Sequence, residues 1–145
     1  MHIKQLSSDY SVAPQIAIED VAKILNAGFK SVICNRPDQE NPVPCQIEAI
    51  KTAVLAVGLE FSENVFDSYS FGSDKVERQT ELLKQLPSPV LAYCASGNRC
   101  SVIWAFSLAG TLGIDAILEA TKHAGYQLSH LRPQLENLAL SNVAD

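Results

Sequence analysis

Apolar residues recur every three or four positions in several stretches of the chain, which is the spacing of one helix face. In the first of these stretches Ile18, Val21 and Leu25 fall on one side, and Gly28 supplies a natural C-terminal stop. Ser73 is placed to cap the third stretch. The pattern predicts helices over residues 18–29, 45–57, 73–86, 101–109, 114–124 and 129–140.

Short apolar runs between these helices predict strands. Residues 90–93 are nearly all apolar and follow Pro89, as expected of a central parallel strand that is covered on both faces. Two further strands are expected over residues 30–34 and 59–66. Strands that alternate with helices pair in parallel, and functional groups gather beyond their carboxyl ends. We therefore expect one domain over residues 1–145, with a three-layer α/β/α fold and a mostly parallel central sheet.

Composition and charge limit the kinds of partner that we expect for this chain. Hydrophobic residues make up 47% of the chain and charged residues 19%, which is ordinary for a globular protein. The net charge is −5 and no basic run is long enough to follow a string of phosphates, so nucleic acid is not expected as a partner. No apolar stretch approaches the roughly 20 residues that span a bilayer, and the first residues lack the pattern of a signal peptide. We expect a cytoplasmic location and no membrane partner.

The cysteines at positions 34, 45, 94 and 100 do not point to disulfides or to zinc. A chain of this length buries enough apolar surface to need no disulfides, and no pair of cysteines has Cys-x-x-Cys spacing. We expect no metal and no cofactor.

The candidate chemistry lies in the loop Cys94-Ala95-Ser96-Gly97-Asn98-Arg99, directly after the strand predicted over residues 90–93. Gly97 lets the chain curl so that successive N–H groups point inward, and a helix that begins near Arg99 adds the positive end of its dipole. The centre of such a curl favours an anion, such as phosphate or sulfate. The same field lowers the pKa of the Cys94 thiol, and a thiolate is a competent nucleophile near neutral pH.

Residues around the end of this loop complete the predicted site. Arg99 could hold two oxygens of a tetrahedral anion through its planar fork, and Ser101 could donate to the departing thiolate. Cys100 could form a protective disulfide with Cys94, although a small residue that fills the helix start is the simpler explanation. The anion-binding loop is thus expected to include Ala95, Ser96, Gly97, Asn98, Cys100 and Ser101. The alternative is that Cys94 is an ordinary core cysteine and the turn a connector.

Arg36 and Asp38 follow the strand predicted over residues 30–34, which should end at the same edge of the sheet as Cys94. These two side chains could orient Arg99 or contact a substrate. Ordinary turn chemistry explains Asp38 almost equally well.

Long segments of the chain resemble the beta-lactamase-hydrolase-like, protein-tyrosine-phosphatase-like family of small bacterial domains. The resemblance is carried by residues 12–40, 58–61 and 89–105, which include Asn-Arg-Pro-Asp at 35–38 and the Cys94 loop. It implies the fold of the dual-specificity phosphatases, with Cys94 as the phosphocysteine-forming nucleophile and Arg99 as a phosphate ligand. It also implies that no metal is needed and that the substrate is a phosphate-bearing small molecule or phosphoprotein.

The loop departs from this family in two respects. Cysteine phosphatases usually separate cysteine and arginine by one residue more than the four found here, and Cys100 stands where that arginine is expected. The spacing of Cys94 and Arg99 is also that of many rhodanese sulfurtransferases, although the Asp-x-Arg and Gly-His-Ile-Pro-Gly-Ala-like segments of a rhodanese are missing. Ala95 replaces an arginine that usually follows the nucleophile, which removes one positive charge.

A phosphatase also needs a general acid, normally an aspartate in a loop before the cysteine that protonates the leaving oxygen. Asp67 lies in the expected window and Asp74 at its margin, but an exposed loop aspartate is more often merely solvated.

Taken with the Cys94 loop and the family resemblance, the sequence favours a hydrolase of phosphomonoesters. A sulfurtransferase that carries a persulfide on Cys94 and a non-catalytic anion-binding module are the two alternatives.

Overall fold

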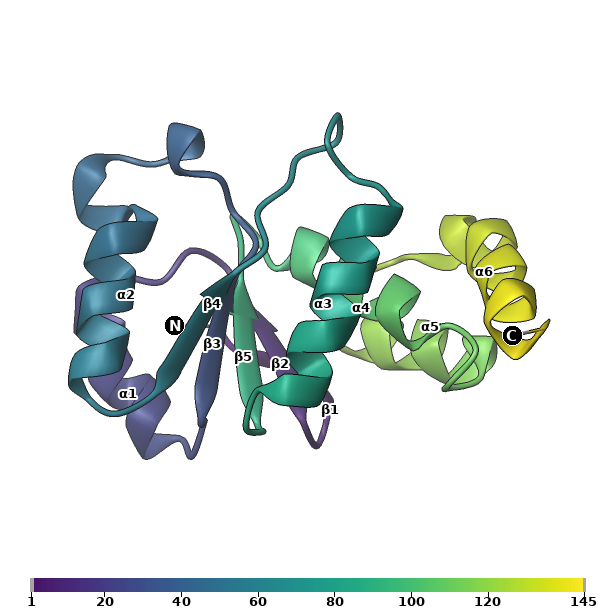
Figure 1. Cartoon of the computed structure of the whole chain (residues 1–145). Helices are drawn as coiled ribbons and strands as arrows, with labels where there is room; N and C mark the ends of the chain where they lie inside the picture. The colour runs from purple at the N-terminus through teal and green to yellow at the C-terminus, as the bar shows by residue number, and fades with distance from the viewer. Residues whose placement is uncertain (1, 145) are drawn as a thin grey trace.

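The computed structural model describes residues 2–144 and shows a five-stranded sheet between layers of helices (Figure 1). The order of strands across the sheet is β1-β2-β5-β3-β4, with β1 antiparallel to β2 and the other neighbours parallel. This arrangement confirms the predicted α/β fold with a mostly parallel sheet. The strands are β1 (Lys4–Ser7), β2 (Tyr10–Ala13), β3 (Ser31–Cys34), β4 (Glu60–Glu63) and β5 (Val90–Tyr93).

The helices form one layer on each face of the sheet. In Figure 1 the first two helices cover one face, the next two cover the other, and the last two lie farther out beyond that second layer. Short 3-10 turns occupy Ile18–Asp20, Asp38–Glu40, Val43–Cys45 and Ser129–Leu131. The helices are α1 (Val21–Asn26), α2 (Ile47–Ala56), α3 (Ser73–Gln85), α4 (Asn98–Leu108), α5 (Ile114–His123) and α6 (Arg132–Ala144).

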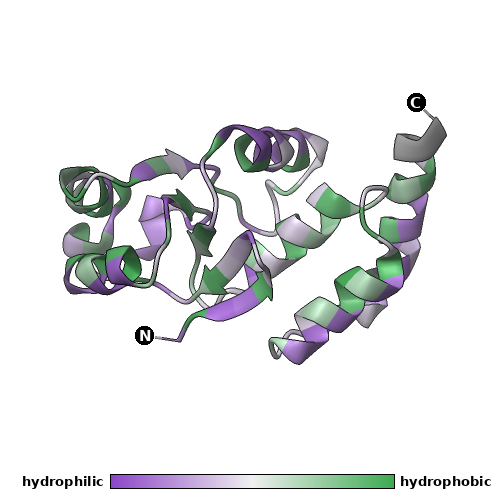
Figure 2. Ribbon diagram, turned by 90° about the horizontal axis from the view of Figure 1, so that it is seen from below, coloured by the Kyte–Doolittle hydropathy of each residue, from purple (hydrophilic) through white to green (hydrophobic). Residues whose placement is uncertain are grey.

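Strand β5 lies between two hydrophobic cores because successive side chains of a strand point to opposite faces. Val90 and Ala92 pack in the core that includes Trp104 of α4, whereas Leu91 and Tyr93 pack in the core on the side of α1 and α2. The strands in the middle of the molecule are mainly hydrophobic in Figure 2. Burial on both faces explains why the sequence of this strand is a continuous apolar run.

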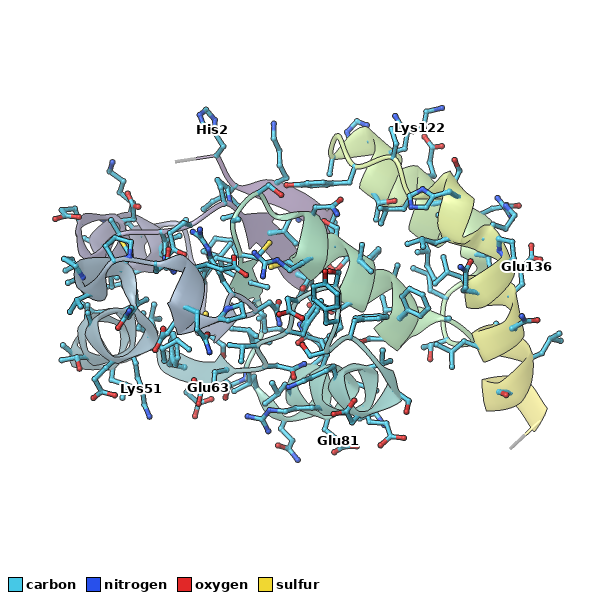
Figure 3. All side chains as sticks on the ribbon, turned by 90° about the horizontal axis from the view of Figure 1, so that it is seen from above. His2, Lys51, Glu63, Glu81, Lys122 and Glu136 are labelled. Atoms are coloured by element: carbon cyan, nitrogen blue, oxygen red, sulfur yellow. The ribbon has the colours of Figure 1, made fainter. Side chains whose placement is uncertain are left out.

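Charged side chains lie mainly at the periphery. The six residues labelled in Figure 3 all point away from the middle of the molecule; they are His2, Lys51, Glu63, Glu81, Lys122 and Glu136. Within residues 2–144, no helix is long and apolar enough to cross a bilayer.

The sequence pattern did not indicate the first two strands. β2 pairs in parallel with β5 and is buried along its whole length, yet it includes Ser11 and follows the polar turn at Ser8 and Asp9. A strand this short, flanked by polar residues, gives no clear alternation of apolar and polar positions.

Several predicted boundaries were also wrong. Gly72, and not Ser73, is the N-cap of α3. The strand predicted over residues 59–66 ends at Glu63, because the Asn64 side chain turns inward and donates to the Lys75 carbonyl at 2.9 Å. The helix predicted over residues 101–109 begins earlier, at Asn98.

Candidate active site

The loop after β5 curls around the sulfur of Cys94, which is fully buried. Gly97 is the N-cap of α4 and has a φ of 91°, a left-handed conformation that glycine adopts without steric penalty. Its N–H donates to Cys94 Sγ at 3.1 Å. The strand, loop and helix therefore follow one another as the sequence predicts, and the start of α4 points its backbone donors at the sulfur.

These donors lower the pKa of the Cys94 thiol from its ordinary value of 9.0 to about 5. The largest cause is a side-chain hydrogen bond with Cys100, and the N–H groups of Cys100, Ser96 and Gly97 add to it, against the opposing effect of burial. The pKa of Cys100 is raised, first by burial and then by its contact with Cys94. The two pKa values move in opposite directions, which favours Cys94 as the group that ionises first and Cys100 as the one that keeps its proton.

The other loop residues lie beside the sulfur or at the rim. Ser101 Oγ donates to the Gly97 carbonyl at 2.8 Å, so the expected contact between this hydroxyl and the thiolate is not made. A serine in the first turn of a helix commonly bonds back to a carbonyl four residues earlier, which explains the difference. The residues Ala95, Ser96 and Asn98 are exposed and form the rim of the loop.

Arg99 is held in place by Glu40, a residue that sequence reasoning missed. Arg99 Nη1 donates to Glu40 Oε2 at 2.8 Å and Nη2 donates to Oε1 at 2.6 Å, while Nη1 also donates to the Phe66 carbonyl at 3.1 Å. The hydrogen bond to Glu40 raises the pKa of Arg99, and the bond from Arg99 lowers the pKa of Glu40. The guanidinium is therefore fixed in one orientation beside the loop.

The contacts within the described part of the chain use three of the five N–H donors of this guanidinium. The remaining two are the Nε–H and the second hydrogen of Nη2, which point in nearly the same direction along one edge of the group. A pair of parallel donors is the geometry that binds two oxygens of a phosphate. The ion pair with Glu40 therefore orients Arg99, and two parallel N–H donors of its guanidinium have no partner among residues 2–144.

Arg36 acts on Arg99 through Glu40. Arg36 Nε donates to Glu40 Oε1 at 3.1 Å, and Arg36 Nη1 donates to Gln15 Oε1 at 3.2 Å. Asp38 has a different place: its Oδ1 accepts a hydrogen bond from the N–H of Ile47, the first residue of α2, at 2.8 Å. The geometry favours a positioning role for Arg36 and a helix-capping role for Asp38.

Asp67 lines a cavity of about 440 Å³ beside Arg99. Its Oδ1 accepts hydrogen bonds from the N–H groups of Ser70 and Tyr69, both at 2.9 Å, and from the Ser70 hydroxyl. These bonds, the one from Ser70 first, lower the pKa of Asp67, whereas a general acid must begin its step protonated. The cavity is lined by Glu40, Phe66, Asp67, Ser68, Phe71, Arg99 and Val102.

Residues 2–111 match the family described as the phosphatase-like domain of beta-lactamase hydrolase-like proteins. The chain belongs to this family. A candidate phosphatase from Neisseria meningitidis Z2491 is 32% identical; the superposition covers 95% of this chain and 99% of that one, with a TM-score of 0.83. The beta-lactamase hydrolase-like protein of Xylella fastidiosa is 24% identical over 97% of this chain, but the chain spans only about a third of that protein's length, 33%.

More distant structures share the fold of this phosphatase-like domain. The structure of PTPMT1 in complex with PI(5)P superimposes with a TM-score of 0.75 at 13% identity, covering 99% of this chain and 98% of that one. Similarity at this level of identity concerns the fold alone. It agrees with the predicted cysteine-phosphatase fold, in which the loop after the central strand of the sheet leads into a helix.

A layer of buried polar side chains lies behind the loop of the phosphatase-like domain. Gln79 accepts hydrogen bonds from the side-chain amides of Asn35, at 3.1 Å, and Asn64, at 3.0 Å. Gln79 in turn donates to the Tyr10 hydroxyl at 3.4 Å, and that hydroxyl donates to the Cys100 carbonyl at 2.9 Å. The layer joins the ends of three strands and α3 to the first turn of α4. Isolated polar residues in otherwise apolar segments gave no sequence signal for it.

Proposed function

We propose that the protein is a cysteine-dependent phosphatase that hydrolyses phosphomonoesters through a phosphocysteine intermediate. The observation that carries this proposal is the Cys94 sulfur, whose pKa is lowered to about 5, enclosed by the N–H groups of its own loop. Arg99 supports it, because its orientation is fixed by Glu40 and two of its donors are left for a ligand. Membership of a phosphatase-like family agrees with the proposal.

The reaction needs two displacements at phosphorus. In the first, the Cys94 thiolate forms an S–P bond, and the P–O bond to the leaving group breaks with its electron pair on that oxygen. In the second, water attacks phosphorus, the S–P bond breaks, and inorganic phosphate leaves as the thiolate is restored. Charge that develops on the equatorial oxygens is stabilised by the loop N–H groups and by Arg99. The chain itself supplies the proposed nucleophile Cys94, the loop N–H groups that bind the phosphate, and the cation Arg99. The proposed mechanism is therefore metal-independent.

The substrate is a phosphate-bearing small molecule or a phosphoprotein. The cavity beside Arg99 has apolar walls formed by Phe66, Phe71 and Val102, and the first two rings lie 5.3 Å apart between centroids. An apolar leaving group would fill this space while its phosphate occupies the loop. p-Nitrophenyl phosphate is therefore a suitable first substrate.

Sulfur transfer is the second candidate, because four residues separate Cys94 from Arg99 as in many rhodaneses. In that reaction the Cys94 thiolate takes the outer sulfur of thiosulfate and releases sulfite, and cyanide then removes this sulfur as thiocyanate. The structural neighbours favour the phosphatase. A thiosulfate:cyanide transferase assay beside p-nitrophenyl phosphate hydrolysis separates the two reactions.

The direct test of the proposed function is Cys94→Ser. We expect this variant to lose hydrolysis of p-nitrophenyl phosphate and to keep its binding of inorganic phosphate, since the loop N–H groups and Arg99 remain. Cys45→Ser is the matched control, because Cys45 lies in the 3-10 turn before α2 and not in the loop. Hydrolysis that survives in Cys94→Ser excludes Cys94 as the nucleophile. Phosphate binding by the wild-type chain without any turnover supports the third candidate, a non-catalytic anion-binding module.

A further inference from the structure

Tyr126 reaches the loop from a part of the chain outside the match to the family, which ends at residue 111. Its hydroxyl donates to the Ser96 carbonyl at 3.0 Å, across a sequence separation of 30 residues. The same hydroxyl lies so close to Gly97 that a Cβ at this position would overlap it. Tyr126 is thus in contact with the middle of the anion-binding loop.

The end of α5 fixes the position of Tyr126. Gly125 has a φ of 101°, its N–H donates to the Lys122 carbonyl at 2.9 Å, and the N–H of Tyr126 donates to the Thr121 carbonyl at 2.8 Å. These two bonds form a Schellman motif, which ends a helix in a defined geometry. The flanking Leu128 is buried in the core beside α4. The tyrosine is therefore delivered to the loop by a rigid cap.

The bond from Tyr126 acts on the same peptide group that faces the sulfur. The Ser96 carbonyl and the Gly97 N–H belong to one planar trans peptide, so they point in opposite directions. The Gly97 N–H donates to Cys94 Sγ at 3.1 Å, while the Ser96 carbonyl accepts from Tyr126 on the other side. Rotation of this peptide would turn the carbonyl oxygen toward the thiolate. Gly97 has no Cβ to oppose that rotation.

We propose that Tyr126 is a positioning residue, whose hydroxyl holds the Ser96–Gly97 peptide with its N–H directed at Cys94 and at a bound anion. The part of this proposal that concerns a bound anion rests on the proposed phosphatase function, whereas the effect on the thiol does not. Burial, followed by the nearby Cys94 and Cys100, raises the pKa of Tyr126. The hydroxyl accordingly stays protonated and remains a donor when Cys94 is ionised.

The test compares Tyr126→Phe, which removes only the hydroxyl, with Tyr69→Phe, a control at a side chain that is 96% exposed. The rate of alkylation of Cys94 by iodoacetamide is measured from pH 4 to 9, alone and with inorganic phosphate as a protecting anion, in a Cys45→Ser background. We expect Tyr126→Phe to raise the midpoint of the alkylation profile by about one pH unit and to weaken protection by phosphate about tenfold. Tyr69→Phe should match the parent protein.

Tyr126→Ala adds a second comparison, because it removes the ring as well as the hydroxyl. A midpoint that shifts in Tyr126→Ala but not in Tyr126→Phe overturns the proposal, since ring packing alone would then matter. An unshifted midpoint in both variants overturns it as well. The outcome is separate from that of the proposed function: a parent protein that does not hydrolyse p-nitrophenyl phosphate still reports the effect of Tyr126 on its thiol.

Discussion

Cys100 stands one residue beyond Arg99, and its side chain has the largest effect on the pKa of Cys94. Its thiol is the first cause of the lowered pKa of Cys94, although an arginine at this position would be expected from the usual phosphatase spacing. The shortened loop therefore stabilises the thiolate from within the first turn of α4, while Arg99 supplies the positive charge one position earlier. If Cys100 merely fills the helix start, its replacement by another small side chain leaves the pKa of Cys94 unchanged.

Paired substitutions at Cys100 test this interpretation. Cys100→Ser keeps a donor at the same position, and Cys100→Ala removes it. Because a donor to the charged form lowers a pKa, we expect the pKa of Cys94 in Cys100→Ala to lie about one pH unit above that in Cys100→Ser. The midpoint of the iodoacetamide alkylation profile gives this value. Equal midpoints in the two variants would contradict the donor role of Cys100.

Asp67 remains the predicted proton donor, and its substitution distinguishes that role from turn capping. Asparagine keeps the side-chain oxygen that accepts from Ser70 and Tyr69, but it carries no acidic proton. If Asp67 is the general acid, we expect Asp67→Asn to slow the hydrolysis of an alkyl phosphate about 100-fold. Hydrolysis of p-nitrophenyl phosphate should slow much less, since only the poor leaving group needs the proton. Comparison of kcat for the two substrates provides the measurement. An equal effect on both assigns Asp67 to the turn alone.

At the scale of elements, the junction between β5 and α4 depends on Gly97 for two separate reasons. Its φ of 91° is unfavourable for any side chain, and a Cβ there would overlap the Tyr126 hydroxyl. Gly28 shares the first property, with a φ of 96°, but has open space around it. Comparison of the same substitution at Gly28 and at Gly97 therefore separates the effect of backbone strain from the effect of the contact with Tyr126.

We expect Gly28→Ala to lower the free energy of unfolding by about 1 kcal/mol through backbone strain alone. Gly97→Ala should lower it by about 2 kcal/mol or more and should also displace Tyr126 from Ser96. Urea unfolding gives the two free energies, and the alkylation profile of Cys94 reports the loop. An unchanged alkylation profile in Gly97→Ala would show that the contact with Tyr126 adjusts without cost.

The sequence predicted those elements whose limits are set by residues next to them in the chain. β5 was predicted with its observed limits, because its apolar run is bounded by Pro89 and by the loop. The position of Cys94 followed from that strand, and Gly97 indicated the turn. Glu40 and Tyr126 could not be found in this way, since each meets the loop across a long stretch of chain, 59 residues between Glu40 and Arg99. Contacts of this kind depend on the order of strands and on how helices pack, which periodicity does not specify.

At the scale of the whole molecule, segments from both ends of the chain meet at one loop. Tyr10 of β2 donates to the Cys100 carbonyl, and Tyr126 after α5 donates to the Ser96 carbonyl. The carbonyl bound by Tyr126 shares its peptide with the Gly97 N–H that donates to Cys94, whereas the carbonyl bound by Tyr10 lies in the first turn of α4, where the Ser101 N–H donates to the Gly97 carbonyl. The fold thus orients the backbone of the site with residues that lie far from it in sequence.

The charge state of this site also couples to the folding of the whole chain. Because the folded state lowers the pKa of Cys94 from 9.0 to about 5, the unfolded chain binds its proton more tightly over that interval. The resulting stabilisation of the folded state is complete above the ordinary pKa of 9.0. It is lost as the pH falls through the pKa of the folded state, about 5. Cys34 acts oppositely, since burial raises its pKa to about 11, and its contribution is lost as the pH rises from 9.0 toward that value.

The free energy of unfolding should therefore increase between pH 5 and pH 8, by at most about 4 kcal/mol from Cys94. Urea unfolding of the wild-type chain and of Cys94→Ser over this interval isolates the contribution, because other titrating groups are common to both proteins. We expect the difference between the two curves to widen as the pH rises, since serine has no charge to stabilise. Parallel curves would mean that the folded chain holds Cys94 as a neutral thiol. The N–H groups of the loop would then have no electrostatic effect on the Cys94 sulfur.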